Sequence, residues 1–186
     1  MNQHLIRPVR AEEWQKIKEL RIAALRDPVA HLAFLERLED AEGRSDEFWQ
    51  KRAAGAAGGR RARQFVAEAA DGSWDGSVVV LVEEPGAADF FEGVIDRHQG
   101  HLVGVFVRAE QRGTGLIDEL FRAAVEWAWS LEEPALERVR LYVHEDNTRA
   151  AAFYRRFGFV PSGRVVSLES DPDAKELEYV LERPAS

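Results

Sequence analysis

An arginine and two glycines separate an apolar run from a stretch of helical spacing in the middle of the chain. The run is His101 to Val107, Arg112-Gly113-Thr114-Gly115 follows it, and apolar residues recur at helical intervals from Leu116 to Leu131. The N-terminus of a helix exposes unpaired N–H groups and carries a partial positive charge. Because glycine has no Cβ, the backbone before such a helix can wrap around an anion. The spacing indicates a phosphate-binding turn, with an ordinary tight turn as the alternative.

Two common nucleotide-binding motifs do not fit this turn. A P-loop requires a lysine and then a serine or threonine after its glycines, and no lysine or serine follows here. The dinucleotide fingerprint requires a third glycine, but Asp118 occupies that position. The turn therefore indicates neither of these two sites.

The turn instead resembles the acyl-CoA signature of the GNAT N-acetyltransferase superfamily, [RQ]-x-x-G-x-[GA] after an apolar strand. Arg112 to Gly115 supply the first four positions, and Ile117 stands at the sixth, where the family usually has a small residue. Residues 147–159, NTRAAAFYRRFGF, resemble the family's downstream motif N-x-x-A-x-x-[FL]-Y-x-x-x-G-F. Residues 6–28 are similar to the family's first strand and helix, and in element order the resemblance spans residues 4–181. It implies one domain, residues 1–186, that uses acetyl-CoA and no metal.

The resemblance also implies roles for single residues. Backbone groups of one strand would hold the acetyl and pantetheine amides, and the turn would bind the CoA pyrophosphate; these residues are Val105, Phe106, Val107, Arg112, Gly113, Thr114, Gly115, Leu116 and Ile117. Tyr154 would donate a proton or hydrogen bond to the leaving thiolate, because a phenol of pKa about 10 suits a thiol of pKa about 8.5. Packing in the core is the alternative for Tyr154. Asn147, two helical turns earlier on the same face, would contact the cofactor or cap its helix.

The amine that accepts the acetyl group must lose a proton before it attacks. An amine of pKa about 10 is only about one part in a thousand neutral at pH 7, so a base is expected. His101 is the candidate, because it lies six residues before Val107 and alternate residues of a strand share a face. His144, Glu145 and an ordered water are the alternatives. No spacing of His, Asp or Glu resembles a metal site.

Charge indicates the class of acceptor. The 186 residues carry 33 acidic and 25 basic side chains, a net charge of −8, which disfavours nucleic acid as a partner and favours a cation. Acids also cluster in the segment where the family builds its acceptor site, namely Glu36, Glu39, Asp40 and Glu42, and solvation of the helix surface is the alternative explanation for them. The expected reaction is acetylation of a primary amine on a small, cationic molecule. A protein lysine or N-terminus as acceptor, or an inactive CoA-binding module, are the alternatives.

The chain has no cysteine, which excludes an acyl-cysteine intermediate and fits a cytoplasmic protein. No apolar run approaches the roughly 18 residues of a membrane span, and residues 1–10 lack the apolar core of a signal peptide. Neither a membrane nor export is therefore expected. A homodimer is one option for the oligomeric state, which the sequence leaves open.

The elements that must position these residues indicate an α/β domain. Helices are expected at 11–26, 45–54, 114–130 and 147–157, and strands at 4–10, 63–69, 77–82, 101–107, 138–143, 159–168 and 175–181. The order β-α-α-β-β-β-α-β-α-β-β predicts a central mixed sheet flanked by helices, mostly antiparallel as in the GNAT fold. Residues 55–61, GAAGGRR, are expected to break the second helix, and residues 84–100 to form a long irregular connection.

Overall fold

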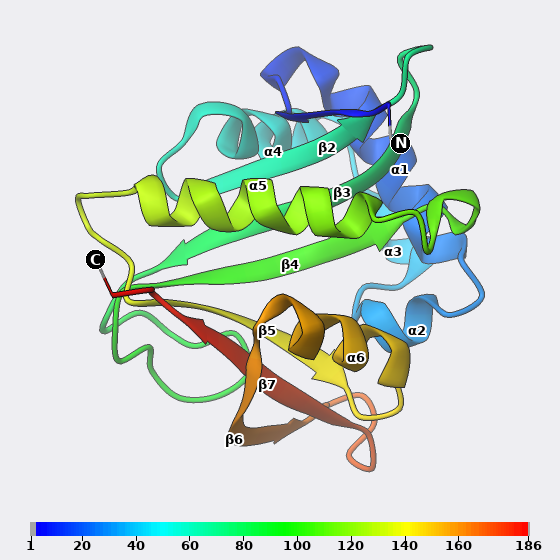
Figure 1. Ribbon diagram of the computed structural model, residues 1–186. Coiled ribbons are helices and arrows are strands. Elements are labelled where there is room, and N and C mark those ends of the chain that lie inside the picture. Colours follow the sequence, from blue (N-terminus) through cyan, green and yellow to red (C-terminus); the bar gives the residue numbers. More distant parts are fainter. Residues whose placement is uncertain (1–2, 186) are drawn as a thin grey trace.

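A seven-stranded sheet forms the centre of the computed structural model, which describes residues 3–185 (Figure 1). Its strands lie in the order β1-β2-β3-β4-β5-β7-β6. The bounds are β1 Leu5–Pro8, β2 Ala62–Glu68, β3 Trp74–Glu83, β4 Gln99–Val107, β5 Arg138–His144, β6 Val160–Ser167 and β7 Lys175–Glu182. All neighbouring strands are antiparallel except β4 and β5, which run parallel. The predicted mixed, mostly antiparallel sheet is confirmed.

Helices cover both faces of this sheet (Figure 1). They are α1 Trp14–Arg26, α2 Ala30–Ala33, α3 Leu38–Glu42, α4 Asp46–Gly58, α5 Leu116–Ser130 and α6 Thr148–Phe157, with short 3₁₀ turns at Ala11–Glu13 and Ala109–Gln111. Helices α1 and α4 bury one core with Val66 and Phe106 of the sheet. Helices α5 and α6 bury the other, because their apolar residues recur on one side of each helix.

Two local expectations differ from the structure. Helix α4 continues through the glycine-rich segment to Gly58, because Trp49, Ala53 and Ala56 are buried against the core and outweigh the poor helix propensity of glycine. The segment between α1 and α4 also contains the short helices α2 and α3, which the sequence pattern did not predict.

Strand β4 contains a bulge at Gly104. Ser77 of β3 pairs with Phe106, but Val79 pairs with Val103, so two residues of β4 stand opposite one of β3. Gly104 has a φ of +60°, a conformation that glycine adopts without strain. The extra residue reverses which side chains of β4 point to each face of the sheet. Leu102 packs in the core under α5, and beyond the bulge Val105 and Val107 pack there too. The prediction that His101 and Val107 share a face is therefore wrong.

The same strand separates from its neighbour. β4 and β5 pair only where residues 99–101 meet residues 138–140. Beyond this point the β5-side edge of β4, from Leu102 onward, has no strand partner among the described residues. Backbone N–H and C=O groups on that edge are thus available to a ligand.

Candidate active site

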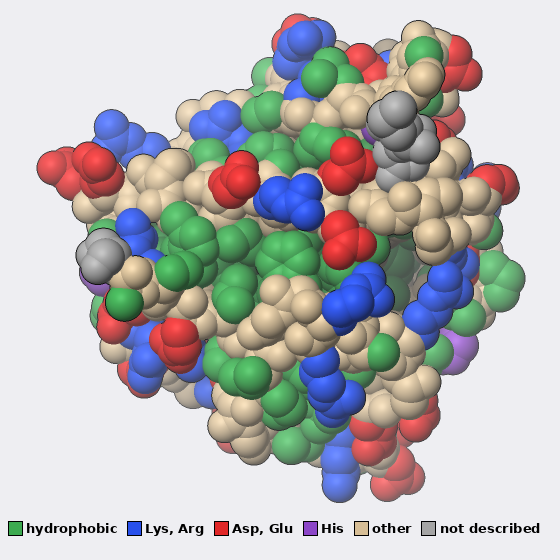
Figure 2. All heavy atoms as spheres, viewed as in Figure 1, with side chains coloured by type: hydrophobic (Ala, Val, Ile, Leu, Met, Phe, Trp, Pro, Cys, Tyr) green, Lys and Arg blue, Asp and Glu red, His purple; other side chains and the backbone are tan. Residues whose placement is uncertain are grey.

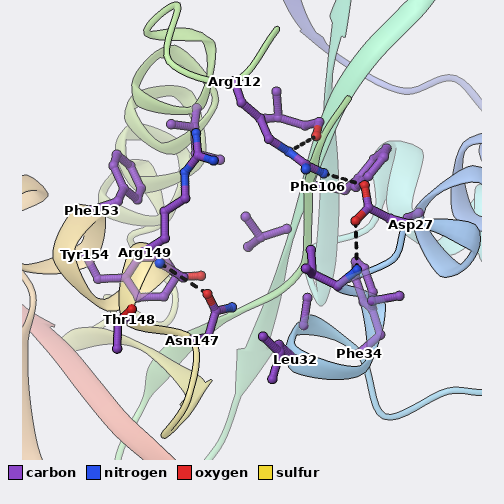
Figure 3. Close-up of a pocket in the computed structure, with 18 of the residues that line it drawn as sticks. Asp27, Leu32, Phe34, Phe106, Arg112, Asn147, Thr148, Arg149, Phe153 and Tyr154 are labelled. Atoms are coloured by element: carbon purple, nitrogen blue, oxygen red, sulfur yellow. Dashed lines mark hydrogen bonds and ion pairs between the residues drawn. The ribbon is translucent and has the colours of Figure 1, made fainter. Parts of the chain in front are cut away.

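A cavity of about 390 Å³ lies between the ends of α1, β4, α5 and α6 (Figure 3). Its size is typical of small-molecule sites. It gathers most of the predicted cofactor-binding residues together with the predicted catalytic Tyr154; they are Val105, Phe106, Val107, Arg112, Gly113, Leu116, Ile117, Asn147 and Tyr154. His101, Thr114 and Gly115 do not line it. In the view of Figure 2, the surface has a recess with basic side chains at its border.

The glycine turn gives the cavity an end formed by backbone. Gly113 and Gly115 have φ values of +79° and +86°, which other residues rarely adopt. The Thr114 hydroxyl donates a hydrogen bond of 2.6 Å to the Gln111 carbonyl and stabilises the turn. Gly115 begins α5 without a side-chain cap, so the N–H groups of the first helical turn are not occupied by a capping side chain. This end of the cavity is suited to an anion.

The arginine of the signature fastens this turn to α1. Its guanidinium donates to the Asp27 carboxylate at 2.6 Å and to the Val107 carbonyl at 3.2 Å. Burial opposes ionisation of Asp27, but hydrogen bonds from the Val29 N–H and from Arg112 lower the pKa of Asp27. Asp27 lines the cavity beside Arg112 (Figure 3). This role of Asp27 could not be predicted from the sequence, because Arg112 lies 85 residues further along the chain.

Tyr154 faces the cavity from α6 (Figure 3). Its ring stacks on Phe121 with centroids 5.7 Å apart and meets Phe153 and Phe159 edge-on. Its hydroxyl has no hydrogen-bond partner among the described residues. Burial and the nearby charge of Glu176 raise the pKa of Tyr154, so its hydroxyl stays protonated at neutral pH. Tyr154 thus packs in the core through its ring and offers a proton through its hydroxyl.

Two residues at the start of α6 also line the cavity. Asn147 accepts a hydrogen bond of 3.3 Å from the Ala150 N–H, so it caps the helix as one of the two alternatives predicted. Arg149 is exposed and reaches along the cavity toward the end that Arg112 borders (Figure 3). Sequence reasoning missed Arg149, although it follows Asn147 by only two positions.

The predicted bases lie outside this cavity. His101 is 3% exposed, and its Nδ1 lies 3.3 Å from the Glu83 carboxylate on the other face of β4. Burial opposes ionisation of Glu83, but His101 and Arg140 lower the pKa of Glu83 to about 2. His144 accepts a hydrogen bond of 3.1 Å from the Asp146 N–H, and Glu145 is exposed. Neither lines the cavity.

A smaller cavity of about 60 Å³ occupies the gap between β4 and β5. It shares Leu32, Ala33, Val105, Asn147 and Tyr154 with the large cavity, so the two adjoin. Glu176 of β7 lines its far side, and burial raises the pKa of this carboxyl to about 7. Nothing in the local sequence distinguishes Glu176 from the other acids of its strand.

The acids of the segment between α1 and α4 are largely paired. Glu36 binds Arg21 at 2.8 Å and Arg44 at 3.0 Å, and Glu42 binds Arg26 at 2.8 Å. Arginines therefore neutralise much of the negative charge that the sequence placed at the acceptor side. Within residues 3–185, no group of three or more His, Asp or Glu could hold a metal ion, and no helix is long and apolar enough to cross a membrane.

Comparisons with known structures agree with this architecture. A GNAT-family acetyltransferase from Streptococcus pneumoniae superposes with a TM-score of 0.74 at 20% identity, over 97% of this chain and 100% of that one. Ribosomal-protein-S5-alanine acetyltransferase from Vibrio fischeri gives 0.73 at 16% identity, over 98% and 94%. NAA60 from Arabidopsis thaliana in complex with acetyl-CoA gives 0.68 at 16% identity, over 97% and 100%.

No curated protein matches the chain significantly. Residues 14–159, most of the chain, match the model of the acetyltransferase (GNAT) family. This match covers the glycine turn and the whole of α6, the two segments that carry the sequence resemblance. The chain belongs to the GNAT acetyltransferase family.

Proposed function

We propose that the chain transfers the acetyl group of acetyl-CoA to a primary amine by direct attack within a ternary complex. One observation carries the proposal: the glycine turn, the unpaired edge of β4 and Tyr154 border the same cavity. Each supplies one part of what an acyl-CoA requires, namely an anion site, amide partners and a proton donor. The shared fold of solved family members supports the same reading.

The cofactor is placed by backbone groups. Its pyrophosphate would accept hydrogen bonds from the N–H groups between Gly113 and Ile117 at the start of α5. Its pantetheine amides would extend along the edge of β4 at Val105 to Val107. The thioester would then lie where the two cavities adjoin, next to Tyr154.

Acetyl transfer needs one bond to form and one to break at the thioester carbon. The neutral amine nitrogen attacks this carbon, and the carbon–sulfur bond breaks with its electron pair on sulfur. Tyr154 donates its hydroxyl proton to the sulfur and takes one back from the nitrogen of the product amide. Its raised pKa favours this role, because the hydroxyl remains a donor throughout the neutral pH range.

The acceptor that we propose is a small cationic amine. The net charge of −8 and the carboxylate of Glu176 beside the expected thioester position both favour a cation. A second candidate is a protein N-terminus or lysine. An open cavity of about 470 Å³, bordered by Leu35, Phe90, Phe91 and residues 167–170, favours an acceptor that continues beyond the amine. The resemblance to an enzyme named for ribosomal protein S5 alanine is consistent with it.

Thiol release tests the proposal directly. The protein is incubated with acetyl-CoA and a panel of polyamines, amino sugars, amino acids and short peptides, and free CoA is followed colorimetrically. We expect one class to release thiol well above the rate of hydrolysis, with the acetylated amine seen by mass spectrometry. Tight binding of acetyl-CoA by calorimetry without thiol release for any class would instead identify an inactive CoA-binding module.

A further inference from the structure

Glu176 places a carboxylate in the gap between β4 and β5. The residue is only 7% exposed, and its carboxylate has no hydrogen bond or ion pair among the described residues. Buried carboxylates are normally paired, because an unpaired buried charge is costly. An unpaired carboxylate in a cavity is therefore a candidate functional group.

Neighbouring acids of the sheet differ from it. Glu178, two residues along β7, accepts hydrogen bonds from Arg140 at 2.9 Å and from Ser162 at 2.7 Å. Glu83 is bound by Arg140 and His101. Of Glu83, Glu176 and Glu178, only Glu176 has both carboxylate oxygens free, within the described part of the chain, to accept hydrogen bonds from a ligand.

Few titratable groups face Glu176. From β5, His144 lies opposite it in register and Tyr142 lines the same cavity. From α6, Tyr154 lies close enough that the charge of Glu176 raises the pKa of the tyrosine. The parts of β4, α2 and β6 packed nearby contribute only apolar residues or glycine; they are Leu32, Ala33, Leu102, Val103, Gly104, Val105 and Val166. Along β7 itself, Lys175 is exposed and Glu178 is bound to Arg140.

We propose that Glu176 is the general base of the acetyl transfer. Its carboxylate takes one proton from the acceptor ammonium, the neutral nitrogen attacks the thioester carbon, and Glu176 then releases this proton to solvent. Tyr154 handles the second nitrogen proton and the leaving sulfur, so the reaction yields amide, free CoA thiol and one proton. This inference rests on the proposed function and assigns the base to a residue that lines the cavity between β4 and β5, whereas His101 lines neither of the two adjoining cavities.

The raised pKa of the Glu176 carboxyl supports its role as the base. Burial raises the pKa of Glu176 to about 7, close to the value at which a base is both deprotonated and able to hold a proton near neutral pH. Below this pH the carboxyl is protonated and cannot accept a proton. Above it the carboxylate also attracts the cationic form of the amine.

The test compares wild type with Glu176→Gln on the best amine over pH 5.5 to 9.5. Wild-type kcat/KM should rise through about pH 7, following the pKa of Glu176. In Glu176→Gln, kcat/KM at pH 7.5 should be about 100-fold lower than in wild type. It should recover in part as the pH approaches the amine pKa of about 10, because more of the amine is then already neutral. The affinity of the variant for CoA should stay unchanged. Glu182→Gln, the same change at an exposed position of β7, should match wild type.

Two further variants keep the outcome decisive. Glu176→Ala should regain activity with added formate, which supplies a carboxylate to the vacated space. His144→Gln distinguishes Glu176 from His144, which lies opposite it. If the rise of kcat/KM with pH is lost in His144→Gln but retained in Glu176→Gln, the base is His144. Superimposable pH profiles for wild type and Glu176→Gln would overturn the assignment of Glu176 as the base and leave the proposed acetyl transfer standing. Wild type without thiol release on any amine would overturn the proposed function as well.

Discussion

The cavity proposed for the cofactor (the cofactor half) and the cavities proposed for the acceptor (the acceptor half) are lined in different ways. The cofactor half is lined by residues from three segments, 24–34, 105–117 and 146–154, and the last two carry the glycine turn and the Asn147 cap. The acceptor half is lined by residues from distant segments that come together only in the folded chain, namely Leu32, Ala33, Leu35, Phe90, Phe91, Tyr142, residues 167–170 and Glu176. Recognition by backbone can be encoded in one local motif, whereas a site made of side-chain charges depends on tertiary placement.

A buried ionic cluster supports the acceptor half. Arg140 is 1% exposed and binds Glu83, Asp89 and Glu178 at 2.9 to 3.0 Å. Burial opposes its charge, but the carboxylates of Glu83 and Glu178 raise the pKa of Arg140, so it remains a cation. Asp89 belongs to the connection between β3 and β4, and the Phe91 ring in the same connection packs 4.6 Å from that of Tyr142. The cluster thus holds this connection against the sheet.

The largest effect is expected where this cluster is broken. Arg140→Met should lower the free energy of unfolding by about 3 to 5 kcal/mol, because it removes the buried cation that Glu83, Asp89 and Glu178 share. Urea denaturation at pH 7 measures the change. Arg97→Met removes a surface pair with Asp96 and should cost less than about 1 kcal/mol. Equal losses for the two variants would mean that the cluster does not stabilise the acceptor half.

In the cofactor half, Tyr154→Phe should reduce kcat by about 100-fold and change the KM for acetyl-CoA much less. In the proposed mechanism the hydroxyl acts on the leaving sulfur in the transition state, while the ring of the variant would continue to pack on Phe121. Steady-state kinetics under conditions where chemistry limits the rate give both constants. Tyr179→Phe, a buried tyrosine whose ring centroid lies 6.4 Å away, is the matched control and should retain kcat. An unchanged kcat in Tyr154→Phe would leave only the packing role.

The unpaired carboxylate of the acceptor half should reduce stability at alkaline pH. Glu176 has a native pKa of about 7 against an ordinary value of 4.5, so the native state binds more protons between these values. Stability contributed by this group is therefore lost as pH rises from 4.5 to 7. We expect Glu176→Gln to be roughly 2 kcal/mol more stable than wild type at pH 8.5, relative to their difference at pH 4. Parallel stability curves against pH would contradict the raised pKa.

Gly113→Val should weaken CoA binding about 10-fold by calorimetry, because a side chain at this turn obstructs the approach of the pyrophosphate. Gly72→Val is a close control. Both glycines have positive φ, +79° and +86°, and an added Cβ meets no atom within 4 Å at either position. The two variants should lose similar stability, and only Gly113→Val should lose affinity. Equal CoA affinities would remove the turn from the binding site.

The smallest effect is expected at Arg149. Its exposed cation borders the cavity without an ion pair among the described residues, so Arg149→Ala should weaken CoA binding only about threefold. This difference should shrink between 50 mM and 500 mM salt, because an exposed charge is screened. Arg155→Ala on the same helix, outside the cavity, should leave affinity unchanged. A salt-independent loss would indicate a packing role for the Arg149 side chain.

Much of the fold could be predicted because its signals are local. The apolar spacing of α5 and α6, the glycines before α5 and the Asn147 cap all depend on residues within one or two helical turns. The face of His101 could not be assigned from the same rules, because one inserted residue at Gly104 reverses every side chain beyond it. A glycine inside an apolar strand is itself a signal of such a bulge.

The strands, the four longer helices and the backbone turn suited to an anion could be predicted from the residues alone, since each follows from periodicity or from glycine's lack of a Cβ. Which of the acids facing the interior is left unpaired depends on the folded chain. Glu36, Glu83 and Glu178 each have an arginine from another element, and Glu176 has none among the described residues. Burial and ion pairing depend on chain segments that meet only on folding, so the environment of a carboxylate, and with it the pKa, is set by long-range contacts.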